Sequence, residues 1–398
     1  MGKDGHGSVV GKSSVYLIVA LFIFGLGWSV GSGKLQFSVG NMSSTQNNQL
    51  PDKLDYSSVD LIYSELKSKY DGELSEADLI SGLKEGLVKS AGDPYTEYMS
   101  PEDAKEFNDS LGGTFEGIGA ELGKDEKGNI IIISPIAGYP AKEAGLMPKD
   151  IIVEIDDESA SDITISEAVD RIRGEKDTDV KLGIIRSGEF KEYTITRQEI
   201  NIPSVKTEIR DQVGIMTISR FGDDTVALAR QAADEFVQAD VKAVVLDLRG
   251  NTGGYLRGAV DVSGLWLDGG STILTERRGE VIVDTLKASG TPKLKGIKTV
   301  ILINEGSASA SEIVAGALKD NGKAELLGQQ TYGKGSVQEP IQLADGGILK
   351  VTIARWYTPN GKNIDKEGIA PDYEVEMTVD DIRADKDPQL DAALQKLQ

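Results

Sequence analysis

The spacing of apolar residues changes along the chain, and each change predicts a different kind of structure. An unbroken apolar run covers residues 15–30, and apolar residues three or four positions apart recur from residue 55 to about 108. Short alternating runs fill residues 113–198, and strand-like runs alternate with helical patterns from residue 199 onward. Unbroken runs are typical of membrane or signal segments, helical spacing of amphipathic helices, and alternation of strands. The chain is therefore expected to hold two or three domains.

The apolar run "VYLIVALFIFGLGWSV" (Val15–Val30) follows a polar start that contains Lys3 and Lys12. It is slightly shorter than the roughly 20 residues that span a bilayer, although Gly31–Gly33 can extend it and Trp28 suits the interface. We expect residues 1–37 to form a cytoplasmic tail with a membrane anchor or signal segment, followed by a polar linker at residues 38–54.

Three interpretations of this run are open. A cleaved signal peptide has the same order of lysines and apolar residues, but the following "SVGSGKLQ" is a poor cleavage site, which favours an uncleaved anchor. Because the positive flank stays inside, either interpretation places the chain from Lys34 onward outside the cytoplasm, on the periplasmic or extracellular face. The third interpretation is a buried core helix.

Residues 55–112 are expected to form a helical segment. Ser75 is placed as a helix N-cap, with Asp78 three residues later. The segment's apolar face would need cover from the rest of the chain or from a second subunit, and residues 379–398 form a similar helical tail, so we expect a homodimer. The apolar residues at helical spacing are Val59, Ile62, Leu66, Leu79, Leu83, Leu87, Leu390, Ala393 and Leu397.

Residues 113–198 combine short strands, one helix (Thr164–Gly174) and a hairpin with its turn at Ser187 and Gly188. This part resembles a PDZ domain, with "GIGA" (Gly117–Ala120) at the position of the carboxylate-binding loop. In such a loop, backbone N–H groups hold a terminal carboxylate and the adjacent strand edge pairs with an extended peptide. The alternative is that "GIG" is only a tight turn. The expected peptide site consists of Gly117, Ile118, Gly119, Ala120, Leu122, Val169 and Ile172, with Arg171 and Arg173 as candidate sensors of occupancy or simply as complements to the helix dipole.

Composition removes several kinds of chemistry. The net charge of −21 repels phosphate backbones, so we expect no nucleic-acid partner. There is no cysteine, which excludes thiol catalysis and disulfides, and the single histidine, His6, excludes a serine–histidine–aspartate triad and histidine-built metal sites. A nucleophile would then be serine or threonine with a lysine, or the site would use a pair of carboxylates.

Residues 199–378 alternate strands with helices, which predicts a largely parallel sheet. In such sheets, active sites lie in the loops that follow the carboxyl ends of the strands. Two loops qualify: the turn "GNTGG" (Gly250–Gly254), which is not a phosphate loop, and "GSASAS", which carries Ser307, Ser309 and Ser311 where a strand enters a helix.

Lys334 stands out among the lysines because glycines flank it, with Gln338 four residues later. A lysine in an apolar pocket loses its proton readily and can act as a general base. The alternative is an ordinary solvated loop lysine.

Three motifs in this order, "DLRGNTGG", "NEGSASASE" and "TYGKGSVQ", resemble the core of the carboxyl-terminal processing (tail-specific) proteases. "DPYTEYMSPEDAKEFNDSLGGTFEGIGAEL" and "RWYTPNGKNIDKEGIAPDYEVE" extend the resemblance, which runs from about Leu54 to the C-terminus. It implies Ser309 as nucleophile, Lys334 as general base and Gln338 as the residue that orients the lysine.

With Ser309 as nucleophile, Ser307 is expected to cap the helix and Ser311 to lie in its first turn. The N–H of Ala310 and an N–H of Gly254 or Gly253 are expected to form the oxyanion hole.

The resulting expectation is an α/β protease core with an inserted α+β PDZ domain, an N-terminal helical segment and an N-terminal membrane anchor. Its function would be that of a serine endopeptidase without metal or cofactor, cleaving extracytoplasmic proteins near free apolar C-termini, with the PDZ domain recruiting substrates or gating the site. A PDZ adaptor that binds tails without cutting them and an acyl-thioester enzyme with a related core are the alternatives.

Overall fold

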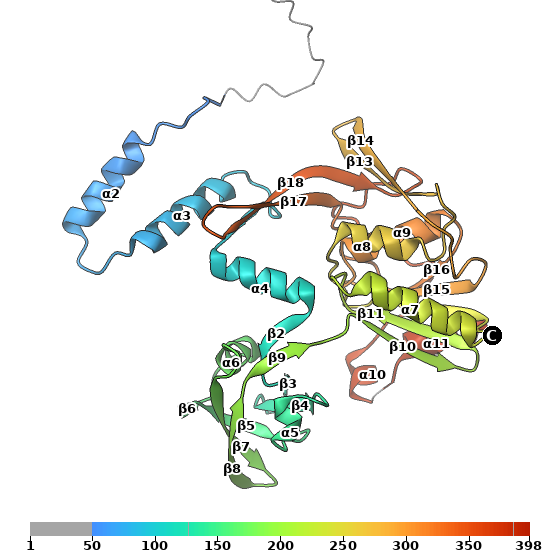
Figure 1. Ribbon diagram of the computed structural model, residues 1–398, viewed down its shortest axis with the longest axis horizontal. Coiled ribbons are helices and arrows are strands. Elements are labelled where there is room, and N and C mark those ends of the chain that lie inside the picture. The colour runs from blue at the N-terminus through green and yellow to red at the C-terminus, as the bar shows by residue number, and fades with distance from the viewer. Residues whose placement is uncertain (1–49, 126, 385) are drawn as a thin grey trace, which may run out of the picture. The chain divides into compact units, whose positions relative to one another are not determined.

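The computed structural model describes residues 50–125, 127–384 and 386–398 (Figure 1). The chain forms two units, which divide between Leu74 and Ser75. The described part of the first unit holds helix α2 (Ser57–Lys69), which confirms the predicted helix and carries exposed Ile62 and Leu66. The predicted anchor and residues 38–49 of the predicted linker lie outside the described residues. Within the described ranges, no helix has the length and hydropathy of a membrane span.

The second unit begins with helix α3 (Glu76–Lys89), strand β1 (Glu97–Met99) and helix α4 (Pro101–Gly112). Ser75 caps α3 as predicted, since its hydroxyl accepts the Asp78 N–H at 3.3 Å. The wholly helical interpretation of residues 55–112 is wrong at β1, because a three-residue strand is too short to show a period. Gly113, with a φ of +70°, ends α4 in the left-handed conformation that glycine adopts without strain.

The PDZ-like part contains a sheet in the order β3-β4-β5-β7-β8, with β6 paired to β5. Strand β2 pairs with β9, so the chain enters and leaves this domain through one antiparallel ribbon. Ser187 and Gly188 form the predicted β7–β8 turn with positive φ angles. The elements are β2 (Thr114–Gly117), β3 (Ala120–Lys124), β4 (Ile130–Pro135), α5 (Pro140–Glu143), β5 (Ile151–Ile155), β6 (Glu158–Ser159), α6 (Ile165–Ile172), β7 (Asp179–Arg186), β8 (Glu189–Thr196) and β9 (Gln198–Asn201).

The α/β core is built on a six-stranded sheet in the order β10-β11-β12-β15-β16-β19, parallel except at β10. Helices α7, α8 and α9 pack on one face and α11 on the other. The elements are β10 (Val205–Arg210), β11 (Val213–Ile218), α7 (Thr225–Gln238), β12 (Ala243–Asp247), α8 (Leu256–Ser263), β15 (Lys298–Ile303), α9 (Ala310–Asp320), β16 (Glu325–Gly328), β19 (Tyr373–Glu374), α10 (Val379–Arg383) and α11 (Pro388–Leu397).

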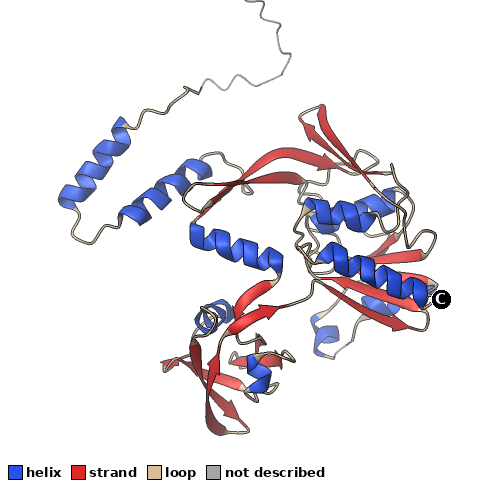
Figure 2. Ribbon diagram, in the orientation of Figure 1, coloured by secondary structure: helices blue, strands red, loops and turns tan. Residues whose placement is uncertain are grey.

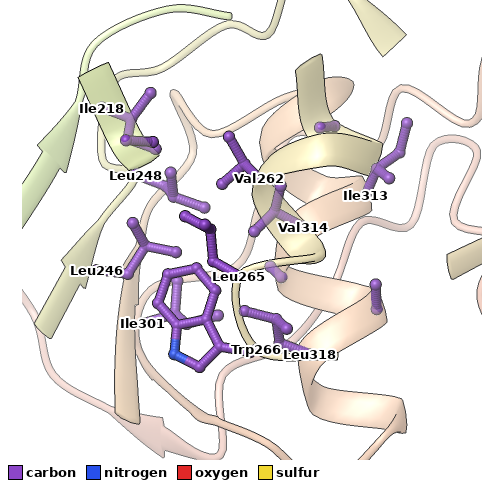
Figure 3. Packing of buried hydrophobic residues seen from close by; sticks show 14 of the residues in the cluster. Ile218, Leu246, Leu248, Val262, Leu265, Trp266, Ile301, Ile313, Val314 and Leu318 are labelled. Carbon is purple, nitrogen blue, oxygen red and sulfur yellow. The ribbon is translucent and has the colours of Figure 1, made fainter. Parts of the chain in front are cut away.

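Successive side chains of the central strands point to opposite faces of this sheet, because a strand has a period of two residues. Leu246 and Ile301 face the helices α8 and α9, where they pack around Trp266 (Figure 3). Val245 and Leu302 face α11 on the other side. Because both faces are covered, the central strands are almost continuously apolar. Such apolar runs allow these strands to be predicted from the sequence.

A second, antiparallel sheet was not predicted. It contains β1, β18 (Ile348–Tyr357), β13 (Thr272–Arg278), β14 (Val281–Lys287) and β17 (Ser336–Gln342). Figure 1 labels β17, β18, β13 and β14 of this sheet, and Figure 2 shows them among the other strands, all in red. The β1–β18 pair joins a segment that precedes the PDZ-like part to one near the end of the chain, with Glu97 opposite Lys350.

Arg249, two residues after the end of β12, connects the sheet to α11. Its guanidinium donates to both carboxylate oxygens of Asp247 and of Asp387, and to Gln389 at 3.0 Å. Bidentate pairs of this kind fix geometry as well as charge. They hold the start of the glycine-rich loop, residues 250–254, to the C-terminal helix.

We predict that Phe236→Ala lowers the free energy of unfolding by about 3 to 5 kcal/mol, because the fully buried ring packs against Gly214 and its removal leaves a cavity. Urea denaturation followed by tryptophan fluorescence would measure the change. Val237→Ala, at the next position of α7 and 53% exposed, is the control and should change stability by less than about 0.5 kcal/mol. Equal effects of the two substitutions would contradict this account.

Candidate active site

Ser309 occupies the turn between β15 and α9, where it is the N-cap residue of the helix. Its φ of 52° and ψ of −113° place it in a region that side-chain-bearing residues rarely adopt. Such strain is typical of functional turns that must present one side chain. Here the residue lines a cleft of about 860 Å³.

The neighbouring serines have structural roles. The buried Ser307 hydroxyl donates to the Leu248 carbonyl at 2.8 Å, and the Ser311 hydroxyl donates to the Asn251 carbonyl at the same distance. Ser311 lies in the first turn of α9 as predicted, but the predicted capping role of Ser307 is wrong, since the helix begins at Ala310. Both hydroxyls instead attach this loop to the segment after β12.

Lys334 lies in the loop before β17 and lines the same cleft as Ser309. The flanking glycines allow close packing, because a Cβ on Gly335 would approach the Asp365 nitrogen to 2.6 Å and one on Gly333 the Gly368 nitrogen to 2.8 Å. The pKa of the Lys334 ammonium is lowered below its usual value. Burial is the largest cause, and the positive charge of Lys350 is the next. The negative charges of Glu97 and Glu312 act in the opposite direction but do not cancel this lowering. The structure thus provides the desolvated lysine that the glycine-flanked motif predicted.

Glu312 was missed in the sequence. Its carboxylate is fully buried and accepts the N–H groups of both Ser309 and Lys334 on Oε2, each at 2.9 Å. On Oε1 it accepts the Gly333 N–H at 2.8 Å and the Thr331 hydroxyl at 2.5 Å. The signal was available, because Ser309 and Glu312 have the spacing of a capping box.

The Glu312 carboxylate fits its site in the ionised form. Burial raises the pKa of this carboxyl group, while the donated hydrogen bonds oppose that rise. The Thr331 hydroxyl itself accepts the Ile369 N–H at 2.7 Å, so its own proton is directed to the carboxylate. All four groups around the carboxylate donate hydrogen bonds, so a proton on Glu312 would find no acceptor. Protonation would therefore break one of the hydrogen bonds that connect the Ser309 segment to the Lys334 segment.

Backbone N–H groups for an oxyanion are available next to Ser309. Among the described residues, neither the Ala310 N–H nor the Gly254 N–H has a hydrogen-bond partner, whereas the Gly253 N–H donates to Asn251 Oδ1 at 2.9 Å. A Cβ on Gly253 would lie 3.1 Å from the Ala310 nitrogen, so the glycine-rich loop runs directly beside the start of α9. The geometry favours Gly254 over Gly253 as the second donor.

Gln338 lies on β17 and lines the cleft with Lys334. Its amide nitrogen donates to the Ser336 hydroxyl at 2.7 Å and to the Thr352 hydroxyl at 3.3 Å. The structure thus brings Gln338 into the site, where its amide N–H groups bond to these two hydroxyls. Its expected role in orienting Lys334 stays a prediction.

In the PDZ-like part, β3 is an edge strand and α6 packs beside it. The predicted peptide-site residues fall into two groups. Ala120, Leu122 and Val169 are half-buried along β3 and α6, while Ile118 and Ile172 are buried in the domain core. Gly119 has the positive φ of 72° expected for the carboxylate-binding turn, and Gly117 belongs to β2, which pairs with β9.

The two arginines at the end of α6 have other partners. Arg173 places its guanidinium 4.8 Å from the ring centre of Phe115, and Arg171 forms an ion pair with Glu158 at 3.0 Å. Arg173 thus contacts the β2–β9 ribbon through which the domain joins the core. No group of three or more acidic or histidine side chains suited to a metal ion occurs in the described ranges.

Comparison with known proteins gives two family matches and several relatives. The model of peptidase family S41 matches residues 212–375, and the PDZ domain model matches residues 106–185. The chain is 36% identical over 341 residues to the carboxy-terminal processing protease CtpA of Bacillus subtilis, covering 85% of this chain and 72% of that protein. It is 38% identical over 325 residues to a probable CtpA-like serine protease of Staphylococcus haemolyticus, covering 81% of this chain.

The chain spans about two thirds, 64%, of that staphylococcal relative's length. Among solved structures, it resembles a photosystem II D1 C-terminal processing protease with 28% identity and a TM-score of 0.50, covering 80% of this chain and 86% of that one. A structure of a putative S41 protease from Bacteroides fragilis has the same fold, with 18% identity, a TM-score of 0.58 and coverage of 87% and 98%.

We predict that Glu312→Gln lowers the free energy of unfolding by about 1 to 3 kcal/mol, because an amide nitrogen would face N–H or O–H donors and leave them unpaired. Chemical denaturation measures the effect. The control is Glu305→Gln, which makes the same change at an exposed position of the same loop and should leave stability unchanged. Wild-type stability of Glu312→Gln would show that the four hydrogen bonds do not hold the loop.

Proposed function

Because the chain belongs to the carboxyl-terminal processing proteases of peptidase family S41, we propose that it is a serine endopeptidase with Ser309 as nucleophile and Lys334 as general base. One observation carries this proposal. A strained N-cap serine and a desolvated lysine line one cleft, and within the described ranges the N–H groups of Ala310, the next residue, and of Gly254, which also lines the cleft, have no hydrogen-bond partner. Serine with lysine is also the pairing left open by a sequence with no cysteine and a single histidine.

The reaction follows from these groups. Neutral Lys334 takes the proton of the Ser309 hydroxyl as the oxygen attacks a peptide carbonyl. The Ala310 and Gly254 N–H groups stabilise the oxyanion, and Lys334 then gives the proton to the leaving amine. Water, deprotonated by Lys334, hydrolyses the acyl-enzyme and releases the fragment that was bound to Ser309.

The lowered pKa of Lys334 determines the direction of the pH dependence. Only the neutral amine can accept a proton, so the rate rises with pH as the ammonium loses its proton. Burial lowers the pKa and therefore moves this rise toward neutral pH relative to an exposed lysine.

The substrates we propose are proteins with free, apolar C-termini, which would bind along the β3 edge beside α6 and end at the Gly117–Ala120 turn. Strand addition at this edge supplies the backbone hydrogen bonds. Arg173, which contacts the β2–β9 ribbon, is a candidate sensor through which occupancy would gate the cleft.

We further propose that Val15–Val30 anchors the protein in a membrane, with the catalytic part outside the cytoplasm, and that the protein forms a homodimer. The anchor rests on the apolar run and its lysine flank. The dimer is supported by the exposed apolar residues Ile80, Leu83 and Leu87 of α3, which are left uncovered within their unit.

We predict that Ser309→Ala and Lys334→Ala each abolish cleavage of unstructured proteins that end in apolar residues, because each removes one partner of the proton transfer. Product formation followed by mass spectrometry tests this. The control Lys206→Ala removes an exposed lysine on β10 and should cleave as the wild type does. Undiminished cleavage by either active-site variant would refute the assignment, and binding of tails without cleavage by the wild type would favour the adaptor alternative.

We also predict that the Ser309→Ala chain binds peptides with a free apolar C-terminus more tightly than the same peptides with an amidated end, because amidation removes the charge that the Gly117–Ala120 turn holds. Fluorescence anisotropy with labelled peptides gives both dissociation constants. The inactive chain keeps the peptides intact during the measurement. Equal affinities would exclude carboxylate recognition.

A further inference from the structure

We propose that Tyr95, which precedes the PDZ-like part, is a positioning residue for Lys334. This inference rests on the proposed function for its catalytic meaning. The contact itself is structural, since the Lys334 ammonium lies 5.3 Å from the centre of the Tyr95 ring. Both residues are half-buried.

The Tyr95 segment is held in place by β18. The Asp93 carboxylate accepts the Thr96 hydroxyl at 2.6 Å, and Thr96 Oγ1 in turn accepts the Thr352 N–H of β18 at 3.1 Å. Directly after this turn, Glu97 pairs with Lys350 in the β1–β18 register and forms an ion pair with it. Strand pairing and hydrogen bonds on both sides of Tyr95 thus hold the segment that carries the ring.

The ring has two opposing effects on the lysine. Its bulk keeps water from the ammonium, which disfavours the charged form, and its face attracts the ammonium by about 0.5 to 1 kcal/mol, which favours it. Burial by all of its surroundings is the largest cause of the lowered Lys334 pKa, and we expect the ring to act mainly by contributing to this burial. Burial also raises the pKa of the Tyr95 hydroxyl, which stays neutral beside the lysine.

Other charged and titratable groups surround the pair. Lys350 on β18 lowers the pKa of Lys334, whereas Glu97 on β1 and Glu312 on α9 raise it. Two further groups, Tyr332 and Asp365, raise the pKa of the Tyr95 hydroxyl. None of these groups is removed by a substitution at Tyr95, and comparison of Tyr95→Ala with Tyr95→Phe separates the effect of the ring from that of its hydroxyl.

The experiment measures the Lys334 pKa directly in the full chain. In the inactive Ser309→Ala background, lysine labelled with ¹³C at Cε is titrated by NMR, and the Lys334 signal is identified by its loss in Lys334→Arg. Tyr95→Ala should move the pKa upward, toward the value of about 10.4 for an exposed lysine, because water reaches the ammonium. Tyr95→Phe keeps the ring and should leave the pKa unchanged.

The matched control is Tyr98→Ala, which removes an aromatic ring from the same segment. The Tyr98 ring lies against Lys84, 4.9 Å from its ammonium, and should leave the Lys334 pKa as it is. If Tyr95→Ala fails to fold, Tyr95→Leu keeps the bulk and loses only the attraction, so the pKa should fall. An unchanged pKa in the folded Tyr95 variant, or an equal shift in Tyr98→Ala, would overturn the proposal.

Activity assays separate this inference from the proposed function. In the chain with Ser309 intact, Tyr95→Ala should lower kcat several-fold at pH 7 with little change in KM, and the rise of kcat with pH should move upward with the pKa. The NMR shift without any cleavage by the wild type would reject the proposed function but keep the Tyr95 contact. Normal kcat and an unshifted pKa in Tyr95→Ala would reject the inference and keep the function.

Discussion

The buried Glu312 carboxylate binds the backbone N–H groups of Ser309 and Lys334 at the same oxygen. Burial of an ionised carboxylate costs free energy unless its oxygens accept hydrogen bonds. Here the Ser309 N–H at the start of α9 and donors of residues 331–334 supply these hydrogen bonds. The two loops therefore cannot separate without leaving a charge uncompensated. The buried carboxylate thus links the backbone of Ser309 to the backbone of Lys334.

The parts that the sequence predicted are those with a local signal. Period-two and helical spacing predicted the α/β order of the core, the Ser75 cap and the β7–β8 turn, because each depends on residues only a few positions apart. The PDZ-like and S41 parts agree with the family matches. Composition narrowed the chemistry to serine with lysine or to paired carboxylates, and flanking glycines singled out Lys334, but the choice of Ser309 among three serines came from the family resemblance.

The parts that it could not predict depend on contacts between distant residues. The antiparallel sheet brings Glu97 opposite Lys350, and no local pattern shows that pairing. The choice between Gly254 and Gly253 depends on one hydrogen bond to Asn251. Ser307 was mistaken for a cap because the positive φ of Ser309 delays the start of the helix, and backbone strain of this kind has no sequence signal.

The pairing of β1 with β18 has a consequence for the order in which the protein becomes active. During synthesis the segment with Tyr95 emerges before the PDZ-like part, whereas β18 is among the last strands to be made. Pairing between strands so far apart in the chain is slow to form, because a long loop must close first. A nascent chain with Ser309 and Lys334 already present therefore still lacks the strand that holds Tyr95 in place, so the surroundings of Lys334 are completed only when almost the whole chain has been made and folded.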